Sequence, residues 1–213
     1  MDGNPSLIAA SAEGRLEVVR DLLRAGADVD MQDMLGCTAL MGAAYGGHVG
    51  VVLALCGEGA GTNVQAKDGR TALMEASEKG HVEVVRALLG LGADINLRDE
   101  NGDTAFALVS AKGRLEVLRE LLDNGADIEV KNEAGNTALV SASFAGRVEM
   151  VRWLLDTGAD IDARNKLGET ALMGASAKGR LEVVLELKKR GANPLISDKC
   201  RQHCSRARKN PGN

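Results

Sequence analysis

The sequence repeats itself every 33 residues, and this period sets the strongest limit on what the chain can fold into. The string Gly-x-Thr-Ala-Leu, with Phe as the last residue in one copy, begins at residues 36, 69, 102, 135 and 168. A degenerate copy, Gly-Asn-Pro-Ser-Leu, begins one period earlier at residue 3. A fixed period of this length is typical of repeat architectures, in which each unit packs only against its neighbours.

Glycines mark the turns of each period. Two further series keep the same spacing, at residues 14, 47, 80, 113, 146 and 179 and at residues 26, 59, 92, 125, 158 and 191. With the six glycines that open the copies, these series account for 18 of the 26 glycines. The glycine content therefore indicates three turns per period, where the backbone needs a positive φ or a close approach, and not general flexibility.

The pattern between the glycines predicts two short helices. Thr71 is a candidate N-cap, and the apolar residues after it keep helical spacing until Gly80. A second amphipathic helix follows and ends near Gly92. The polar segment 93–102 predicts an extended turn that joins one helix pair to the next. Helices of about two turns do not persist alone in water, so stability must come from stacking.

Composition supports a folded chain with an unusual core. Hydrophobic residues make up 45% and charged residues 26%, but aromatic residues only 2%. The core must therefore consist mainly of Ala, Leu and Val, and its helices can pack closely. No apolar run approaches the ~20 residues of a membrane span, and residues 1–5 do not begin a signal peptide. Four scattered cysteines favour a reducing compartment, so we expect a cytoplasmic or otherwise intracellular protein, with the nucleus included.

These motifs resemble the ankyrin repeat. The resemblance rests on the period, on Gly-x-Thr-Ala-Leu before the first helix, on Val-Val-x-x-Leu-Leu in the second and on Gly-Ala-Asp after it. It covers residues 3–197 and implies an all-α ankyrin-repeat solenoid of stacked antiparallel helix pairs joined by extended turns. We expect one repeat domain over 1–197, with repeats at about 1–32, 33–65, 66–98, 99–131, 132–164 and 165–197.

The chain departs from the family pattern inside the first helix. The usual Thr-Pro-Leu-His reads Thr-Ala-Leu-Met at 38–41, 71–74 and 170–173, and Ala107 or Val140 replaces the final residue in two other copies. The histidine that ties neighbouring repeats together in the family is thus absent. We expect an apolar contact in its place, and the family's inter-repeat hydrogen bonds are not transferred.

The two ends differ in charge. The first copy carries Glu13, Arg15, Glu17, Arg20, Asp21 and Arg24 among its apolar residues, which suits a polar terminal cap. After Asp198 the chain has five basic residues and no acidic one, against a net charge of −9 for the remainder, which together give −4. We expect residues 198–213 to form a basic, disordered tail.

No catalytic motif stands out from the repeat pattern. The chain has no nucleophile elbow, phosphate loop or His-Glu-x-x-His. Cys200, His203 and Cys204 supply only three of the four ligands of a structural zinc site, so a basic tail is the better interpretation. His48 and His81 recur where other copies have Arg, which favours a structural role. We expect no enzyme activity, no metal and no cofactor.

The resemblance implies that the chain binds proteins on the concave face formed by the turn tips and the exposed side of the first helices. We number repeat positions from the glycine of Gly-x-Thr, which is position 0. Position 9 holds the only Tyr, Tyr45, and one of two Phe residues, Phe144. Exposed aromatics are favoured interface anchors, although each could instead pack on a neighbouring repeat.

Residues near these aromatics complete the candidate site. Met34, Leu35 and Cys37 form an apolar turn tip next to Tyr45, where we place the main contact, and Phe144 with Ala145 and Leu167 forms a smaller one. Trp153 lies on the second-helix side, where it either contacts a partner or covers neighbouring side chains. The remaining candidates are charged, and a solvated face is their alternative interpretation. They are Arg70, Glu78, Lys79, Lys112 and Lys178.

The sequence therefore predicts a non-catalytic protein-interaction module, acting as a scaffold, adaptor, inhibitor or assembly subunit. We expect a protein partner, and a chain that is monomeric or part of a hetero-complex. The alternative is binding of nucleic acid or an anionic surface through the basic tail, which the acidic body disfavours. A third hypothesis is asparagine hydroxylation at Asn63 or Asn96, whose position holds other turn residues in other copies.

Overall fold

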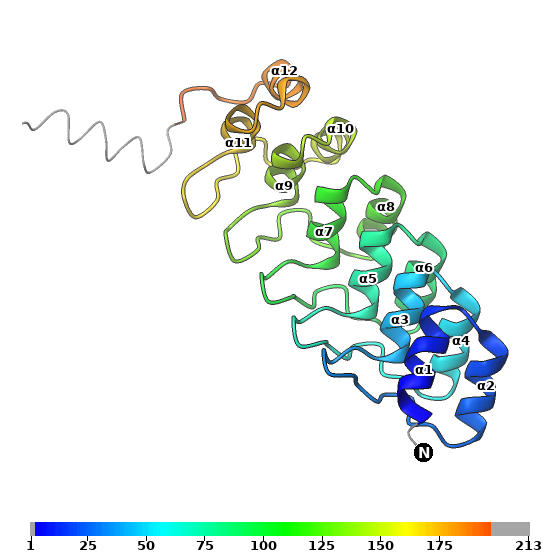
Figure 1. Cartoon of the computed structure of the whole chain (residues 1–213). Helices are drawn as coiled ribbons and strands as arrows, with labels where there is room; N and C mark the ends of the chain where they lie inside the picture. Colours follow the sequence, from blue (N-terminus) through cyan, green and yellow to red (C-terminus); the bar gives the residue numbers. More distant parts are fainter. Residues whose placement is uncertain (1–2, 197–213) are drawn as a thin grey trace, which may run out of the picture. The chain divides into compact units, whose positions relative to one another are not determined.

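The computed structural model describes residues 3–196, with side chains from residue 6 onward, and this part of the chain is entirely helical apart from its turns (Figure 1). The fold class predicted from the sequence is confirmed. The helices of the described part are α1 (Gly3–Ala12), α2 (Leu16–Arg24), α3 (Ala39–Gly46), α4 (Val49–Gly57), α5 (Ala72–Lys79), α6 (Val82–Gly90), α7 (Ala105–Lys112), α8 (Leu115–Asp123), α9 (Ala138–Ala145), α10 (Val148–Asp156), α11 (Ala171–Ala177) and α12 (Leu181–Lys189).

The helices fall into two compact units: of the described residues, 3–109 and 114–126 form the first, and 110–113 and 127–196 form the second. In the first unit, α1, α3 and α5 pack side by side in one layer, and α2, α4, α6 and α8 pack in a second layer. In the second unit, α9 packs beside α11, and α10 packs beside α12. Each unit therefore has a layer of first helices and a layer of second helices, with the turns extending from the first layer.

Threonine side chains fix the start of the first helices. The hydroxyl of Thr71 accepts a hydrogen bond from the N–H of Met74 at 3.3 Å, as the sequence predicted. Such a cap satisfies one of the backbone donors that have no partner within the helix. The same contact recurs at Thr38, Thr104, Thr137 and Thr170. The repeated cap means that α3, α5, α7, α9 and α11 all start at the same point of their repeats, whereas α1, which has Pro5 at the threonine position, starts at Gly3.

The periodic glycines adopt the backbone geometry predicted for them, with one exception. All members of the three series except Gly3 have a positive φ, and Gly3 instead lies in α1. Gly47 shows a second reason for glycine. A Cβ there would lie 2.7 Å from Nδ1 of His81 in the following repeat, so a side chain would push the neighbouring repeat away.

The core consists of small and aliphatic side chains, as the low aromatic content predicted. Leu40, Leu73 and Leu139 of the first helices and Leu55, Leu88 and Leu154 of the second helices are all at most 1% exposed. Phe106 occupies the leucine position of its repeat and is equally buried. Because alanines fill much of the space between these residues, neighbouring helices can approach closely.

Candidate functional site

A hollow beside Tyr45, which we name the Tyr45 groove, lies at the predicted main contact site. Its volume is about 270 Å³, and Tyr45 on its wall is 51% exposed. The lining residues come from the first helices and turns of three successive repeats. They are Ile8, Cys37, Thr38, Met41, Gly42, Tyr45, Ala66, Asp68 and Glu75. The structure thus brings two predicted residues, Tyr45 and Cys37, together in one largely apolar groove.

The composition of α3 explains why Tyr45 faces outward. Its neighbours Ala43 and Ala44 are fully buried, so the side of the helix that they occupy faces the core. Gly42 lies against α1, where an added Cβ would be 3.3 Å from Cβ of Ala12. The absence of a side chain at residue 42 lets α1 and α3 pack closely and leaves open the space in front of Tyr45.

Lys79 reaches back from the end of α5 to the tyrosine ring. Its Nζ atom lies 4.0 Å from the centre of the Tyr45 ring, which is a cation–π contact. The interaction with Tyr45, followed by the charges of Glu78 and Glu75, raises the pKa of the Lys79 ammonium. Lys79, which the sequence singled out as a recurring charge, therefore covers one face of the Tyr45 ring.

Arg70 joins two carboxylates beside the groove. Its guanidinium donates from Nε to Glu75 and from a terminal nitrogen to Glu78. Each of the three side chains is only about 20% exposed. Burial lowers the pKa of Arg70, but hydrogen bonds and charges from the two glutamates outweigh it, so the pKa is raised. Two carboxylates share one guanidinium, and the cluster keeps an excess negative charge.

The thiol of Cys37 reports the electrostatic character of the groove. Burial raises its pKa first, and the negative charges of Asp33, Asp68 and Glu75 raise it further. Ionising this thiol would add another negative charge to an already negative environment, which is why the neutral form is favoured. Three carboxylates therefore lie close enough to the groove to disfavour further negative charge at Cys37.

Met34 and Leu35 lie on the turn tip near the groove but not in its lining. They are 89% and 69% exposed, which makes this tip the most exposed apolar pair in the first unit. Hydrogen bonds fix the backbone of this tip, because the Asp33 carboxylate accepts from the N–H groups of Leu35 and Cys37. The carbonyl of Leu35 in turn accepts from the N–H of Lys67 in the next turn at 2.9 Å.

Seven of the nine lining residues were not singled out as candidates from the sequence, among them Met41, Asp68 and Glu75. Met41 and Asp68 occupy ordinary core and turn positions, so only the fold assigns them to the groove. Glu75 could have been found, because position 6 holds Ala9, Gly42, Leu108, Ser141 and Gly174 in the other copies and no other charge. A single charge in an uncharged position is a signal that comparison between copies can detect.

Phe144 shares position 9 with Tyr45 but lies differently. It is half-buried, and its ring covers Gly174 in α11 of the next repeat, where an added Cβ would be only 1.4 Å from Cε1 of the ring. This geometry matches the alternative in which the aromatic packs on a neighbouring repeat. Leu167, its predicted companion, is 58% exposed on the following turn.

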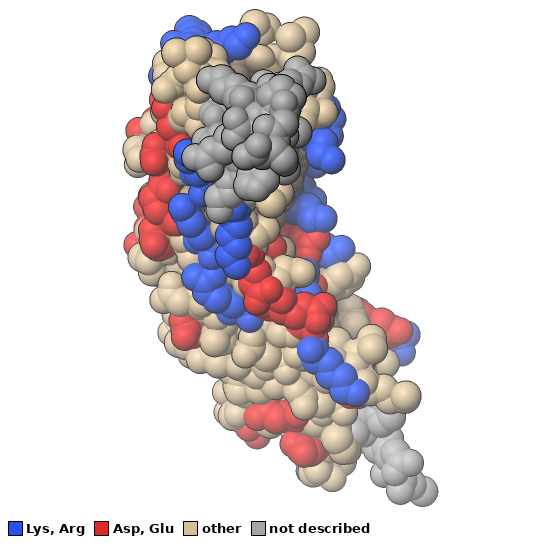
Figure 2. Space-filling model, turned by 90° about the vertical axis from the view of Figure 1, so that its left-hand side faces the viewer, with Lys and Arg blue, Asp and Glu red and all other residues tan. Residues whose placement is uncertain are grey.

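The remaining predicted residues belong to the second unit. Lys112 ends α7 and Lys178 follows α11, and both are exposed. Trp153 lies on α10 and is half-buried, so it differs from the exposed Tyr45. Figure 2 views the molecule from the side of the turns, where basic and acidic side chains both appear among uncharged residues. Tyr45 and Cys37 therefore lie together at the groove, whereas Lys112, Lys178 and Trp153 do not line it.

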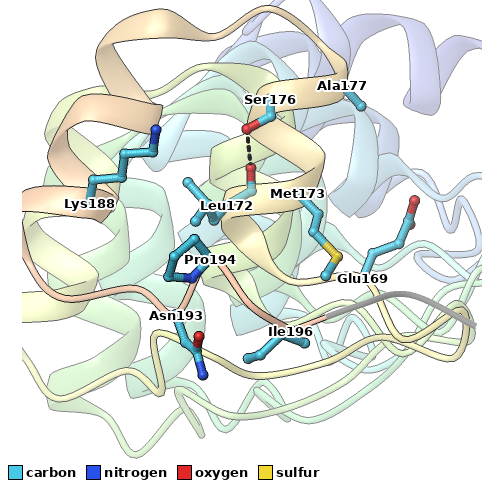
Figure 3. A pocket seen from close by; sticks show the side chains of 9 residues that line it. All are labelled: Glu169, Leu172, Met173, Ser176, Ala177, Lys188, Asn193, Pro194 and Ile196. Atoms are coloured by element: carbon cyan, nitrogen blue, oxygen red, sulfur yellow. Dashed lines mark hydrogen bonds between the residues drawn. The ribbon is translucent and has the colours of Figure 1, made fainter. Parts of the chain in front are cut away.

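A second hollow, of about 490 Å³, lies on the outer side of α11 (Figure 3). Met173 and Ile196 supply apolar walls, and Glu169 and Lys188 lie on opposite sides of it. Residues at the position of Met173 are almost fully buried in other repeats, as Met74 and Val140 show. This hollow therefore lies where a following helix pair packs in the other repeats.

Neighbouring repeats are tied by side chains that precede the second helices. Nε2 of His48 lies 3.0 Å from the carbonyl oxygen of Ala12, and Nε2 of His81 lies 3.0 Å from that of Tyr45. In the second unit, Arg147 and Arg180 donate to the carbonyls of Ala111 and Phe144 at 3.2 Å. The sequence predicted a structural role for the two histidines, and these contacts link each of them to the preceding repeat.

Residues 3–196 contain no group of three or more side chains suited to hold a metal ion. The predicted basic tail and Cys200, His203 and Cys204 lie outside the described residues. The longest described helix has ten residues, and none in that part of the chain is able to cross a membrane.

Comparisons with known proteins agree with this geometry. A model of the family described as ankyrin repeats (3 copies) matches residues 7–99, 89–165 and 106–198. A crystal structure of the human ASB11 ankyrin repeat domain is similar at a TM-score of 0.83 and 29% identity, covering 91% of this chain and 87% of that chain. A search of curated protein sequences gave no match. The matches along almost the whole chain show that it belongs to the ankyrin repeat family.

Proposed function

We propose that the chain is a non-catalytic interaction module that binds a protein partner on the face formed by its turns and first helices. The Tyr45 groove is the main contact site in this proposal. Ankyrin repeats generally act as protein-binding modules, and the presence of the groove supports this role for the chain. The module would serve as a scaffold, adaptor, inhibitor or assembly subunit inside the cell.

The observation that carries the proposal is the half-exposed Tyr45 ring beside apolar groove walls and an exposed apolar tip. Tyrosines in such settings supply large contact areas at low entropic cost, and a few of them dominate binding energy. The groove is preformed, since α1, α3 and α5 fix its walls, and a preformed site lowers the ordering cost of association.

The test is a differential capture experiment. The parent chain, Tyr45→Ala and the control Arg119→Ala, which changes an exposed residue on α8, serve as baits, and captured proteins are quantified by mass spectrometry. We expect one set of proteins to bind the parent and the control but not Tyr45→Ala. With the purified partner, Tyr45→Ala should weaken binding by about 2 kcal/mol or more. Equal affinity of parent and Tyr45→Ala would show that the groove is not the contact site.

The second candidate function rests on the five basic residues after Asp198. They could neutralise a few phosphates of a nucleic acid or an anionic surface, and such binding would fall steeply with salt. Deleting residues 199–213 tests it. Loss of all RNA or DNA binding on deletion would favour this function over the groove.

A further inference from the structure

The charged residues around the Tyr45 groove restrict the charge that a bound segment can carry. Two of its lining residues, Asp68 and Glu75, are acidic, and none is basic. The nearby Arg70 is already shared by Glu75 and Glu78, and Lys79 lies over the Tyr45 ring. Arg70 and Glu75 therefore largely offset each other's charge, and the exposed carboxylate of Asp68, which accepts a hydrogen bond from the backbone N–H of Arg70, is the main charge on the groove wall.

The apolar part of the groove sets the size of the ligand. Its volume of about 270 Å³ is less than the ~300–1,000 Å³ of sites that enclose drug-sized molecules. Ile8, Met41 and Ala66 offer no hydrogen-bonding side chains, so this part suits one apolar side chain of a larger molecule. The negative region lies at the same groove, so one short segment can reach both.

We propose that the Tyr45 groove binds a protein segment that presents an apolar side chain together with a nearby arginine or lysine. The apolar side chain fills the space against Met41 and the Tyr45 ring. The basic group meets Asp68 and the carboxylate pair that shares Arg70, where arginine fits better than lysine because its guanidinium can bind carboxylates in a bidentate manner. This inference rests on the proposed function and adds the chemistry of the partner.

The raised pKa of Cys37 agrees with this assignment. Asp33, Asp68 and Glu75 all act on the thiol in the same direction, so their fields add up at the groove floor. An acidic segment would face like charges there, and such juxtaposition opposes binding. Charge therefore selects between segments that have the same apolar side chain.

The experiment uses a phage-displayed library of random 12-residue peptides. The library is first depleted on the Tyr45→Ala chain and then selected on the parent chain, both at full length. We expect the enriched peptides to combine Leu, Ile, Met or Phe with Arg or Lys within four residues. A set of Tyr45-dependent peptides that is acidic or uncharged would overturn the inference but leave the proposed function standing.

The strongest peptide is then synthesised, and its affinity is measured with designed variants. Replacing its basic residue by Gln, or Asp68→Asn in the chain, should each weaken binding about 10-fold, and both together no further. Asn occurs at the same position as Asn101 in another repeat, so Asp68→Asn suits the turn. The control Glu133→Gln removes the same charge from another exposed turn and should leave affinity unchanged.

The remaining outcomes are also decisive. If Asp68→Asn and Glu133→Gln weaken binding equally, the effect comes from net charge and the inference is wrong. If no peptide depends on Tyr45, and captured proteins also bind Tyr45→Ala, both this inference and the proposed function fail.

Discussion

Tyr45 and Phe144 occupy the same repeat position, yet one forms a groove wall and the other packs on its neighbour. Tyr45 is 51% exposed, with the Lys79 ammonium over its ring. The Phe144 ring is half-buried and covers Gly174 of the next repeat. The backbone around both residues is equivalent, because each lies near the end of a first helix that starts at a threonine cap.

The difference comes from position 6 of the following repeat. That position is Gly174 beside Phe144 and Glu75 beside Tyr45. Glycine leaves room for a ring to lie flat on the helix. Glutamate fills the space and pairs with Arg70, so the tyrosine ring stays exposed. Whether an aromatic ring at position 9 is packed or exposed therefore depends on a residue in the next repeat.

Placing a side chain at residue 174 tests whether Gly174 determines the position of the Phe144 ring, and it should have the largest effect. Gly174→Ala forces the Phe144 ring off α11, and we expect the free energy of unfolding to fall by about 1–3 kcal/mol, measured by chemical denaturation. In a Phe144→Ala background the same change should be neutral or stabilising by up to about 1 kcal/mol, since alanine is the better helix former. An equal cost in both backgrounds would mean that Phe144 does not use this space.

Truncating each aromatic separates the two roles. Phe144→Ala removes a half-buried ring, and we expect a loss of about 2 kcal/mol in unfolding free energy. Tyr45→Ala removes an exposed ring and should cost about 1 kcal/mol or less. Denaturation curves of both variants test this. If the two variants lose the same free energy of unfolding, the two rings contribute equally to folding, and the distinction between a packed Phe144 and an exposed Tyr45 is wrong.

Removing Arg70 tests the polar wall beside Tyr45. Arg70→Ala leaves Glu75 and Glu78 as unshielded neighbours with the same charge, and we expect a cost of about 1 kcal/mol, because the cluster is only partly buried. Glu75→Gln added to Arg70→Ala should recover part of the loss. Arg119→Ala serves as the control for the loss of a positive charge. Unfolding monitored by circular dichroism measures all three.

The smallest expected effect concerns the Cys37 thiol. Its pKa is raised above 9.0, so the thiolate forms at higher pH and alkylation at pH 8 should be slower than for an unperturbed cysteine. Asp68→Asn removes one of the negative charges that raise the pKa of Cys37 and should increase the rate about two-fold. Iodoacetamide labelling with peptide mapping resolves Cys37 from the other cysteines. A rate insensitive to Asp68→Asn would argue against an influence of Asp68 on this part of the groove.

The sequence predicted the helices and turns well, because glycines and threonine caps act within one repeat. The threonine that caps α5 and the exposed Tyr45 were both deduced from their repeat positions. Phe144 could not be placed in this way, since its environment depends on the small size of Gly174. Asp68 was likewise assigned to the groove only when the turn of one repeat was seen beside the first helix of another.

The contacts of His81 and Arg180 have a consequence for how this surface can vary. They hold the carbonyl groups of Tyr45 and Phe144, the residues at position 9. The main chain at this position is therefore anchored by the following repeat, whatever side chain it carries. Substitutions there can change recognition while the scaffold stays in place, so specificity and architecture are free to evolve separately.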